Sequence, residues 1–191
     1  TTPGRTDLQR LLRRMAQAGC THVVLETSSE ALAQSRHFGI PYAASVFTNF
    51  APEHLEAHGS LSAYRAAKGK LFQSLRGRGV AVVNLDDAEA NYFLKFPAEQ
   101  RIGFTIKDAT STGLTETLRA RPREVTARHA LFTVNGADVA LPVGGEFNIA
   151  NALAAMGAAC ALGIELSAAV TALNNYPGTP GRLEFIATDH P

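Results

Sequence analysis

One loop segment of the chain gathers side chains that can act in acid–base chemistry or bind a metal ion. Glu26 follows an apolar run and is itself followed by Thr27, Ser28 and Ser29, so a carboxylate and three hydroxyls stand together. Oxygen donors of this kind can hold a hard metal ion or a polar substrate. The serines can equally well cap the helix that follows. The residues alone leave both interpretations open.

A second segment, residues 49–59, contains two histidines and two glutamates. Glu53 and His54 stand together, and Glu56 and His58 follow within one helical turn. These side chains can ligate a metal ion or form a solvated turn. The spacing does not identify a zinc site, because no cysteine is near and the surrounding donors are mainly oxygens.

Lys68 lies on the apolar side of the helix that the spacing predicts over about residues 60–75. The apolar stripe of that helix consists of Leu61, Tyr64, Leu71, Phe72 and Leu75. Lys68 falls two helical turns after Leu61 and one turn after Tyr64, on the same stripe. A lysine among buried apolar side chains destabilises the fold unless it is paired, is neutralised or extends to solvent. Extension to solvent is the commonest outcome, and a functional lysine is the alternative.

Asn148 and Asn151 share one face of a predicted helix that otherwise consists of alanine, leucine, isoleucine, methionine and glycine. Amides in that position can recognise the polar edge of a purine. Alternatively, Asn148 caps the helix and Asn151 forms a hydrogen bond across the core.

The elements that must position these residues follow an alternating pattern in the first half of the chain. Apolar runs predict strands over residues 21–25, 44–47, 80–84 and 102–106, and helical spacing predicts helices over residues 29–35 and 60–75. A further helix, capped by Thr6, precedes the first strand. Strands that alternate with helices at this spacing are typical of a mostly parallel α/β sheet, whose ligands bind at the carboxyl ends of the strands.

The pattern changes after about Lys107. Residues 123–134 alternate between polar and apolar side chains, Asn135-Gly136 is a strong signal for a tight hairpin, and residues 138–143 can pair back. A small antiparallel meander beside the parallel sheet is therefore expected. An alanine-rich helix over about residues 148–162 and a shorter helix capped by Ser167 follow.

Composition excludes several classes of protein. The 191 residues are 46% hydrophobic and 18% charged with a net charge of +1, so neither disorder nor binding to nucleic acid or membrane through bulk charge is expected. Cys20 and Cys160 stand among small residues, which predicts buried thiols in a reducing compartment. No signal peptide opens the chain, which favours a cytoplasmic location, and its first residue is not Met, which suggests a piece of a longer protein.

Several short segments, in order along nearly the whole chain, resemble one family. They are Thr1-Thr2-Pro3, Glu26-Thr27-Ser28-Ser29-Glu30-Ala31-Leu32, Phe47-Thr48-Asn49, the segment 54–59, Tyr64-Arg65-Ala66-Ala67-Lys68, Asn84-Leu85-Asp86-Asp87, Phe147-Asn148-Ile149-Ala150-Asn151-Ala152 and Pro180-Gly181-Arg182. The sequence resembles the central domain of the Mur ligases, and most closely the MurE type, the UDP-N-acetylmuramoyl-tripeptide synthetases. The resemblance implies a P-loop-NTPase-like α/β fold.

The resemblance also implies a reaction. Such enzymes are ATP- and Mg²⁺-dependent amide ligases that add an amino acid to UDP-N-acetylmuramoyl-L-alanyl-D-glutamate, a peptidoglycan precursor, through an acyl phosphate. By resemblance, Glu26 and His54 are catalytic residues that hold Mg²⁺. Lys68 matches the lysine that is carbamylated, and as an anionic carbamate it would support the metal ion.

The binding residues are likewise assigned by resemblance. Positions matched to binding of the UDP-muramoyl peptide are Thr1, Thr2, Ser28, Gln34 and Arg36. Positions matched to binding of the nucleotide are Asn148, Asn151 and Arg182. The forked donors of Arg36 suit a carboxylate.

The sequence departs from the family pattern in three respects. Glu53 and Glu56 stand where aspartates are usual, and Glu30 replaces a customary histidine. No G-x-x-x-x-G-K-[ST] phosphate-binding loop occurs in the 191 residues, so we expect the isolated chain to be inactive. Residues 1–182 are expected to form a central domain that is incomplete at its amino end, and residues 183–191 to begin the linker to a carboxyl-terminal domain. The choice between diaminopimelate and lysine would lie in that further domain.

Two other functions remain open. A sister ligase of the MurF, MurD or folylpolyglutamate type would use the same chemistry on another substrate. A non-catalytic remnant would bind nucleotide or precursor and regulate. In the preferred interpretation, the parent protein is a monomeric cytoplasmic enzyme whose partners are the UDP-muramoyl peptide and an amino acid.

Overall fold

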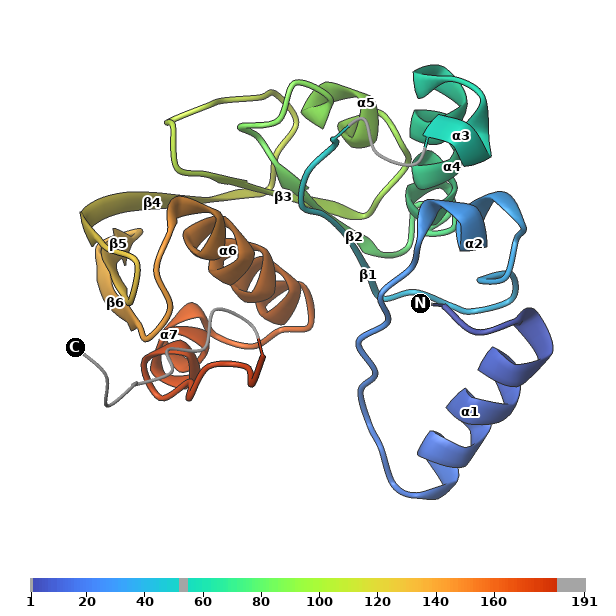
Figure 1. Cartoon of the computed structure of the whole chain (residues 1–191), viewed down its shortest axis with the longest axis horizontal. Helices are drawn as coiled ribbons and strands as arrows, with labels where there is room; N and C mark the ends of the chain where they lie inside the picture. The colour runs from blue at the N-terminus through green and yellow to red at the C-terminus, as the bar shows by residue number, and fades with distance from the viewer. Residues whose placement is uncertain (1, 52–54, 182–191) are drawn as a thin grey trace, which may run out of the picture.

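The computed structural model describes residues 2–51 and 55–181 and contains one six-stranded sheet in the order β1-β2-β3-β4-β5-β6 (Figure 1). The strands are β1 (Ala44–Phe47), β2 (Val80–Asn84), β3 (Gln100–Thr105), β4 (Glu116–Val125), β5 (Ala130–Val134) and β6 (Ala137–Leu141). The first four strands pair in parallel, and the last three pair antiparallel. The predicted parallel α/β sheet with an antiparallel meander is therefore confirmed.

Strand β4 belongs to both halves of this sheet. Its first residues pair in parallel with β3, and its last residues pair antiparallel with β5 after a register shift between Pro122 and Glu124. Proline cannot donate a ladder hydrogen bond and is therefore tolerated in a strand at such an irregularity. The sequence predicts only the part of this strand from residue 123 onward. Pro122 and the charged residues around it obscure the alternation of polar and apolar side chains before that point.

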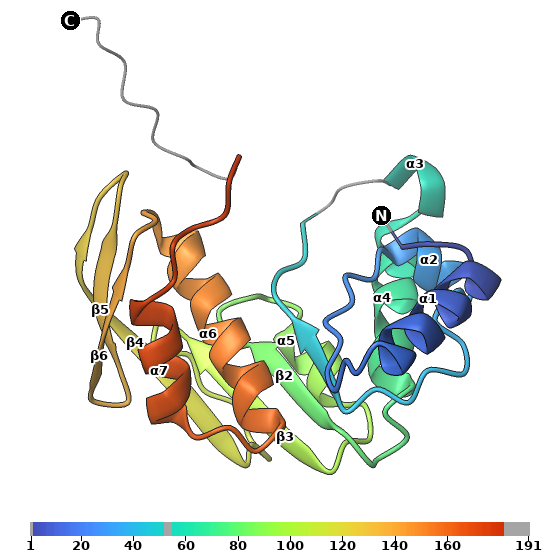
Figure 2. The same cartoon turned by 90° about the horizontal axis from the view of Figure 1, so that it is seen from below.

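Seven helices among the described residues surround the sheet. They are α1 (Arg5–Gln17), α2 (Ser29–Ala33), α3 (Leu55–His58), α4 (Leu61–Gln73), α5 (Ala90–Leu94), α6 (Glu146–Ala161) and α7 (Leu166–Asn174). In the view from below, α6 and α7 cover one face of the sheet, whereas α1 to α4 gather at its β1 end (Figure 2). None of these helices combines the length and the apolar composition needed to cross a membrane.

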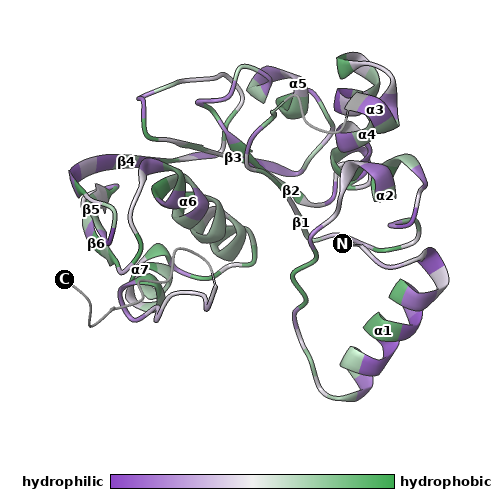
Figure 3. Cartoon of the chain, viewed as in Figure 1, coloured by the Kyte–Doolittle hydropathy of each residue, from purple (hydrophilic) through white to green (hydrophobic). Residues whose placement is uncertain are grey.

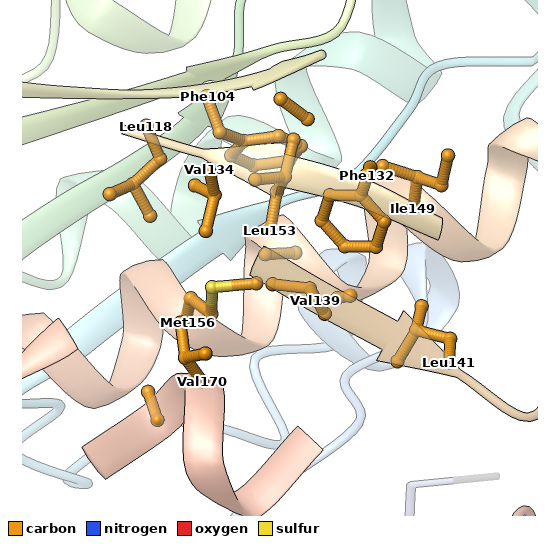
Figure 4. Close-up of a cluster of buried hydrophobic side chains, with 14 of the residues drawn as sticks. Phe104, Leu118, Phe132, Val134, Val139, Leu141, Ile149, Leu153, Met156 and Val170 are labelled. Atoms are coloured by element: carbon orange, nitrogen blue, oxygen red, sulfur yellow. The ribbon is translucent and has the colours of Figure 1, made fainter. Parts of the chain in front are cut away.

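The larger core lies between the sheet and helices α6 and α7. Figure 4 shows Ile149, Leu153 and Met156 of α6 directed at apolar side chains from strands β3 to β6. Alternation along β2 assigns Val80 and Val82 to this core, as expected for a strand covered on both faces.

A second core lies on the opposite face, under α4 and α5. Ala81 and Val83 of β2 point into it and meet a group of phenylalanines. Phe93 of α5 is fully buried, with ring centroids 4.0 Å from Phe47 and 5.1 Å from Phe72. The short helix α5 was not predicted from the sequence, although Phe93 is central to this core.

Small residues let α6 approach the sheet closely. A Cβ atom on Gly157 would lie 2.6 Å from Cγ1 of Val82, so only glycine fits at this contact. Figure 3 shows α6 as mostly apolar or neutral along its length, whereas α1 alternates between apolar and polar positions. The alanine-rich segment is thus a buried core helix, as predicted.

One predicted strand is wrong. Residues 21–25 form no strand, and Val23 and Val24 are 44% and 100% exposed. The run has the apolar composition of a strand, but it pairs with no strand among the described residues. Its extended backbone instead connects α1 to α2.

Three smaller expectations also fail. Gly4, rather than Thr6, precedes α1, and Glu165, rather than Ser167, precedes α7. Cys20 is exposed, although both cysteines are free as expected. Local cap preference is a weak signal, because several polar residues near each helix start satisfy it.

The predicted hairpin is confirmed. Asn135 and Gly136, with φ of 45° and 90°, form the turn between β5 and β6, as a tight turn with two positive φ values requires. The Asn135 side chain also accepts a hydrogen bond from the Arg119 amide at 2.9 Å and donates to the Thr117 carbonyl at 3.1 Å. The turn residue therefore ties the meander back to β4.

Candidate functional site: a polar turn, a lysine helix and an apolar cavity

The first part of the site is built around the buried side chain of Thr2. The Thr2 hydroxyl donates to the Glu26 carbonyl at 3.0 Å and accepts from the Ser28 amide at 3.1 Å. Ser28 in turn caps α2, because its Oγ accepts from the Ala31 amide at 3.2 Å. The capping interpretation of this serine is thus correct locally, and the turn that carries Glu26 is fixed by backbone and hydroxyl contacts.

Arg36 completes this group from the end of α2. One of its Nη atoms donates to the Thr2 carbonyl at 2.9 Å. Its Nε and its other Nη donate to Oε1 of Gln34 at 2.9 and 2.7 Å. The structure therefore brings Thr2 to the segment that contains Ser28, Gln34 and Arg36, although Thr2 is 26 residues before Ser28 and 34 before Arg36. A guanidinium has more donors than these contacts use, so it can also bind an external anion.

His37, next to Arg36, points into the protein instead. It is buried, and its Nδ1 has no hydrogen-bond partner among the described residues. Burial, and to a smaller extent the charge of Lys70, lowers the pKa of His37. The lowered pKa favours a neutral imidazole, so the positive charge next to it in sequence comes from Arg36.

The second part of the site joins that turn to helix α4. Nε2 of His58, in α3, lies 2.9 Å from Oγ of Ser29. The His58 ring lies 5.2 Å from the Tyr64 ring, and Lys68 Nζ lies 5.1 Å from the centroid of the same ring. The segment after Glu26, α3 and α4 therefore meet around Tyr64.

Lys68 is half-buried and has no ion pair or hydrogen bond within the described part of the chain. The expected apolar stripe is only partly right, because Tyr64 and Phe72 are buried whereas Leu61 is 45% exposed. The Lys68 ammonium therefore lies over the face of the Tyr64 ring. This cation–π attraction contributes about 0.5–2 kcal/mol. Among the described residues, an anionic partner or a chemical modification of Lys68 would compete only with this contact to the Tyr64 ring.

Of the three candidate metal ligands, the structure describes Glu26 and Lys68. Glu26 carries an exposed carboxylate but follows no strand, and His54 lies outside the described residues. No group of three His, Cys, Asp or Glu side chains suited to a metal ion occurs in the described ranges. A carboxylate fits a hard ion such as Mg²⁺, whereas an ammonium repels it, so Lys68 fits this site only as an anion.

The third part of the site is a cavity of about 750 Å³ between α6, α7 and the meander. Its walls are largely apolar, and Asn148 and Asn151 supply polar groups. Asn148 Nδ2 donates to the Gly144 carbonyl at 2.8 Å, and Asn151 Nδ2 lies 3.4 Å from Asn148 Oδ1. Apolar pockets of this size with a few fixed polar groups are typical of small-molecule sites.

Two aromatic side chains of this cavity receive no binding role from the sequence, although Phe147 belongs to one of the segments that resemble the family. Phe147, 59% exposed, and Tyr176 both line it. The sequence shows an aromatic residue directly before Asn148, but the exposure of Phe147 is visible only in the folded chain. Arg182 and Thr1, the remaining predicted binding residues, lie outside the described residues.

The fold and these sites define a Mur ligase middle domain. Residues 1–159 match the sequence profile described as "Mur ligase middle domain", so the chain belongs to the Mur ligase family. It is 39% identical over 188 residues to the UDP-N-acetylmuramoyl-L-alanyl-D-glutamate–2,6-diaminopimelate ligase of Synechocystis sp.. That alignment covers 97% of this chain but only 37% of the relative, so the chain spans well under half of that enzyme.

Solved structures agree with this assignment. The structure of a UDP-N-acetylmuramoyl-L-alanyl-D-glutamate–2,6-diaminopimelate ligase aligns with a TM-score of 0.82 and 33% identity, covering 99% of this chain and 39% of the other. MurF from Acinetobacter baumannii aligns with a TM-score of 0.65 and 27% identity, covering 77% of this chain and 32% of the other.

Proposed function

We propose that the chain is the ATP-binding middle domain of a ligase that joins an amino acid to UDP-N-acetylmuramoyl-L-alanyl-D-glutamate. In this proposal residues 1–182 are the domain, and residues 183–191 begin the linker to the next one. The observation that carries it is the convergence of Thr2, Ser28, Gln34 and Arg36 beside the turn of Glu26. The likeness to tripeptide-forming ligases over nearly the whole chain supports the same substrate.

The polar turn is the proposed site of the muramoyl peptide. Arg36, held in place by Gln34 and the Thr2 carbonyl, presents its remaining donors to an anionic group of the substrate. Thr1, which lies outside the described residues, is assigned to the same substrate by its resemblance to the family. Because the turn is fixed by internal hydrogen bonds, substrate binding requires little ordering of the protein.

The cavity beside α6 is the proposed site of the nucleotide base. Its apolar walls suit a flat purine ring, and the amides of Asn148 and Asn151 suit the polar edge. Arg182, directly after the cavity residue Gly181, would reach the ribose and phosphates of ATP.

Glu26, His54 and Lys68, the last as a carbamate, are the proposed holders of Mg²⁺. When bound, the ion would neutralise charge that develops on the phosphates and the carboxylate. Carbamylation replaces the positive charge of Lys68 by a negative one. No ion pair among the described residues opposes that change.

The proposed reaction has two steps. An oxygen of the substrate carboxylate attacks the γ-phosphorus of ATP, and ADP leaves, which gives an acyl phosphate. The amine of the incoming amino acid then attacks the acyl carbon and loses a proton. Inorganic phosphate leaves with one oxygen of the original carboxylate. The parent enzyme is proposed to be monomeric and cytoplasmic.

The substrate assignment is tested by inserting this chain in place of the equivalent residues of the Synechocystis ligase, a protein referred to below as the ligase chimaera. We expect ATP-dependent formation of UDP-muramoyl tripeptide, measured by mass spectrometry. UDP-muramoyl-alanine and the UDP-muramoyl tripeptide itself serve as control acceptors. A folded chimaera that extends only a control acceptor would indicate a sister ligase, and one that binds ATP without any ligation would indicate a non-catalytic remnant.

A further inference from the structure

Asn174, the last residue of α7, joins that helix to the outer edge of the sheet. Strand β6 stands at the end of the strand order, so one side of it has no neighbouring strand among the described residues. On β6, the Ala140 amide donates to Oδ1 of Asn174 at 2.8 Å, and the Asp138 carbonyl accepts from Nδ2 at 3.4 Å. The carboxamide thus takes the place that a peptide group of a further strand would take.

The two elements that Asn174 joins are two walls of the cavity of about 750 Å³. Leu141 directly follows Ala140 on β6, Leu173 directly precedes Asn174 on α7, and both leucines line the cavity. Helix α7 packs against β6, as Figure 1 shows. Asn174 is not itself a lining residue. Its side chain therefore holds these two walls together from outside the cavity.

The chain that follows Asn174 forms another part of the cavity wall. Tyr176 and Thr179 line the cavity, and their hydroxyl groups form a hydrogen bond with each other. The Tyr176 amide donates to the Leu173 carbonyl at 3.1 Å, so this segment starts directly from the end of α7. A displacement of that helix end would move Tyr176 as well as Leu173.

Burial alone holds the end of α7 less firmly than its middle. The buried residues of the helix are Ala169 and Val170, one helical turn before Asn174. Leu173 is half-buried, and Asn174 is exposed. The position of the last turn relative to β6 therefore depends on the two hydrogen bonds of Asn174.

We infer that Asn174 is a positioning residue, which sets the affinity of the cavity for an adenine nucleoside by holding the end of α7 against β6. This inference rests on the proposed function in placing the nucleotide base in the cavity. Asn174 does not touch the base in this account and acts through Leu141, Leu173 and Tyr176. A wall that moves away leaves only a fraction of the molecules able to bind, and the apparent affinity falls by that fraction.

The test uses the 191-residue chain with adenosine as the probe. Adenosine carries no phosphate, so its binding needs neither a phosphate-binding loop nor a cation. Asn174→Ala removes both hydrogen bonds to β6, whereas Asn174→Asp keeps an acceptor for the Ala140 amide. Asn175→Ala is the matched control, because Asn175 Nδ2 donates at 2.9 Å to the Thr171 carbonyl within α7.

Two quantities are measured for each variant by nuclear magnetic resonance: the adenosine dissociation constant and the hydrogen exchange rate of the Ala140 amide. Asn174→Ala should raise both about fivefold, as expected for the loss of one neutral hydrogen bond. Asn174→Asp should return both to within about twofold of the parent values, because a carboxylate oxygen accepts strongly from an amide. Both quantities in Asn175→Ala, and exchange of the buried Val82 amide in every variant, should stay unchanged.

The inference requires affinity and exchange to change together. Faster exchange at Ala140 in Asn174→Ala with unchanged adenosine affinity would overturn it, because Asn174 would then be merely structural. Unchanged exchange would overturn it as well. So would an Asn174→Asp chain in which protection of the Ala140 amide returns but adenosine affinity does not.

Ala155→Phe separates these results from failure of the proposed function. Ala155 lines the cavity from α6, so a phenylalanine there would fill the space proposed for the base. This substitution should abolish adenosine binding. If it does so while Asn174→Ala binds adenosine normally, only the inference fails. If Ala155→Phe leaves adenosine affinity unchanged, the cavity is not the base site, and the proposed nucleotide site and the inference are both wrong.

Discussion

Lys68→Ala should reduce turnover of the ligase chimaera by at least about a thousandfold, since it removes an anionic support for charge that develops during phosphoryl transfer. Folding should change little. Alanine favours the helix, and Lys68 loses only its contact with the Tyr64 ring, which is worth about 0.5–2 kcal/mol. Steady-state phosphate release and the thermal unfolding midpoint measure the two effects separately.

Lys70→Ala is the matched control for this substitution. Lys70 is on the same helix and carries the same charge, but its Nζ donates to the Ala33 carbonyl at 3.0 Å, away from the Tyr64 ring. We expect near-normal turnover for this variant. Added acetate should restore part of the activity of Lys68→Ala by filling the space with a carboxylate. Near-normal turnover of Lys68→Ala without acetate would reject the carbamate.

Gly144→Ala should lower the free energy of unfolding of the chain by about 3 kcal/mol, at the upper end of the usual effect of overpacking. A Cβ at this position would lie 1.9 Å from the Thr126 carbonyl oxygen and 2.5 Å from the Ala127 carbonyl carbon. Both contacts are with backbone, so no side-chain rotation relieves them. Urea unfolding measures the change.

Gly4→Ala is the control, because its Cβ would have no heavy atom nearer than 3.8 Å and its φ of −60° suits alanine. Its effect should stay within about 1 kcal/mol. Equal stabilities of the two variants would contradict the close approach of residues 126–127 to the turn before α6. Because the Gly144 carbonyl accepts from Asn148, this turn also shapes the proposed nucleotide site.

Sequence patterns predict the parts of this fold that local chemistry determines. The bounds of β1 and β2 are predicted as observed, because each is a short apolar run between turn signals. The hairpin at Asn135 is also predicted, since few residues adopt its positive φ readily. The run at residues 21–25 has the same apolar character, but a strand also needs a neighbour, and composition carries no information about pairing.

In the candidate site, too, the sequence predicts what local chemistry determines and does not predict contacts between distant residues. Glu26, Lys68 and the asparagines of α6 are conspicuous because a polar residue stands beside or within an apolar segment. The contact of Arg36 with Thr2 joins residues from separate parts of the chain, so no local pattern predicts it. The hydrogen bonds of Asn84 and Asp87 with the backbone of Thr48 and Phe50 likewise join separate parts of the chain. Only the order of strands in the sheet reveals these contacts.

Isotope transfer in the ligase chimaera tests the central claim most directly. The D-glutamate carboxylate of the UDP-muramoyl dipeptide is labelled with oxygen-18, and the phosphate released with the tripeptide is analysed by mass spectrometry. Because the acyl phosphate gives up its phosphate together with an oxygen of that carboxylate, we predict one labelled oxygen in the phosphate for each tripeptide formed. Tripeptide formation with unlabelled phosphate would contradict the acyl-phosphate mechanism.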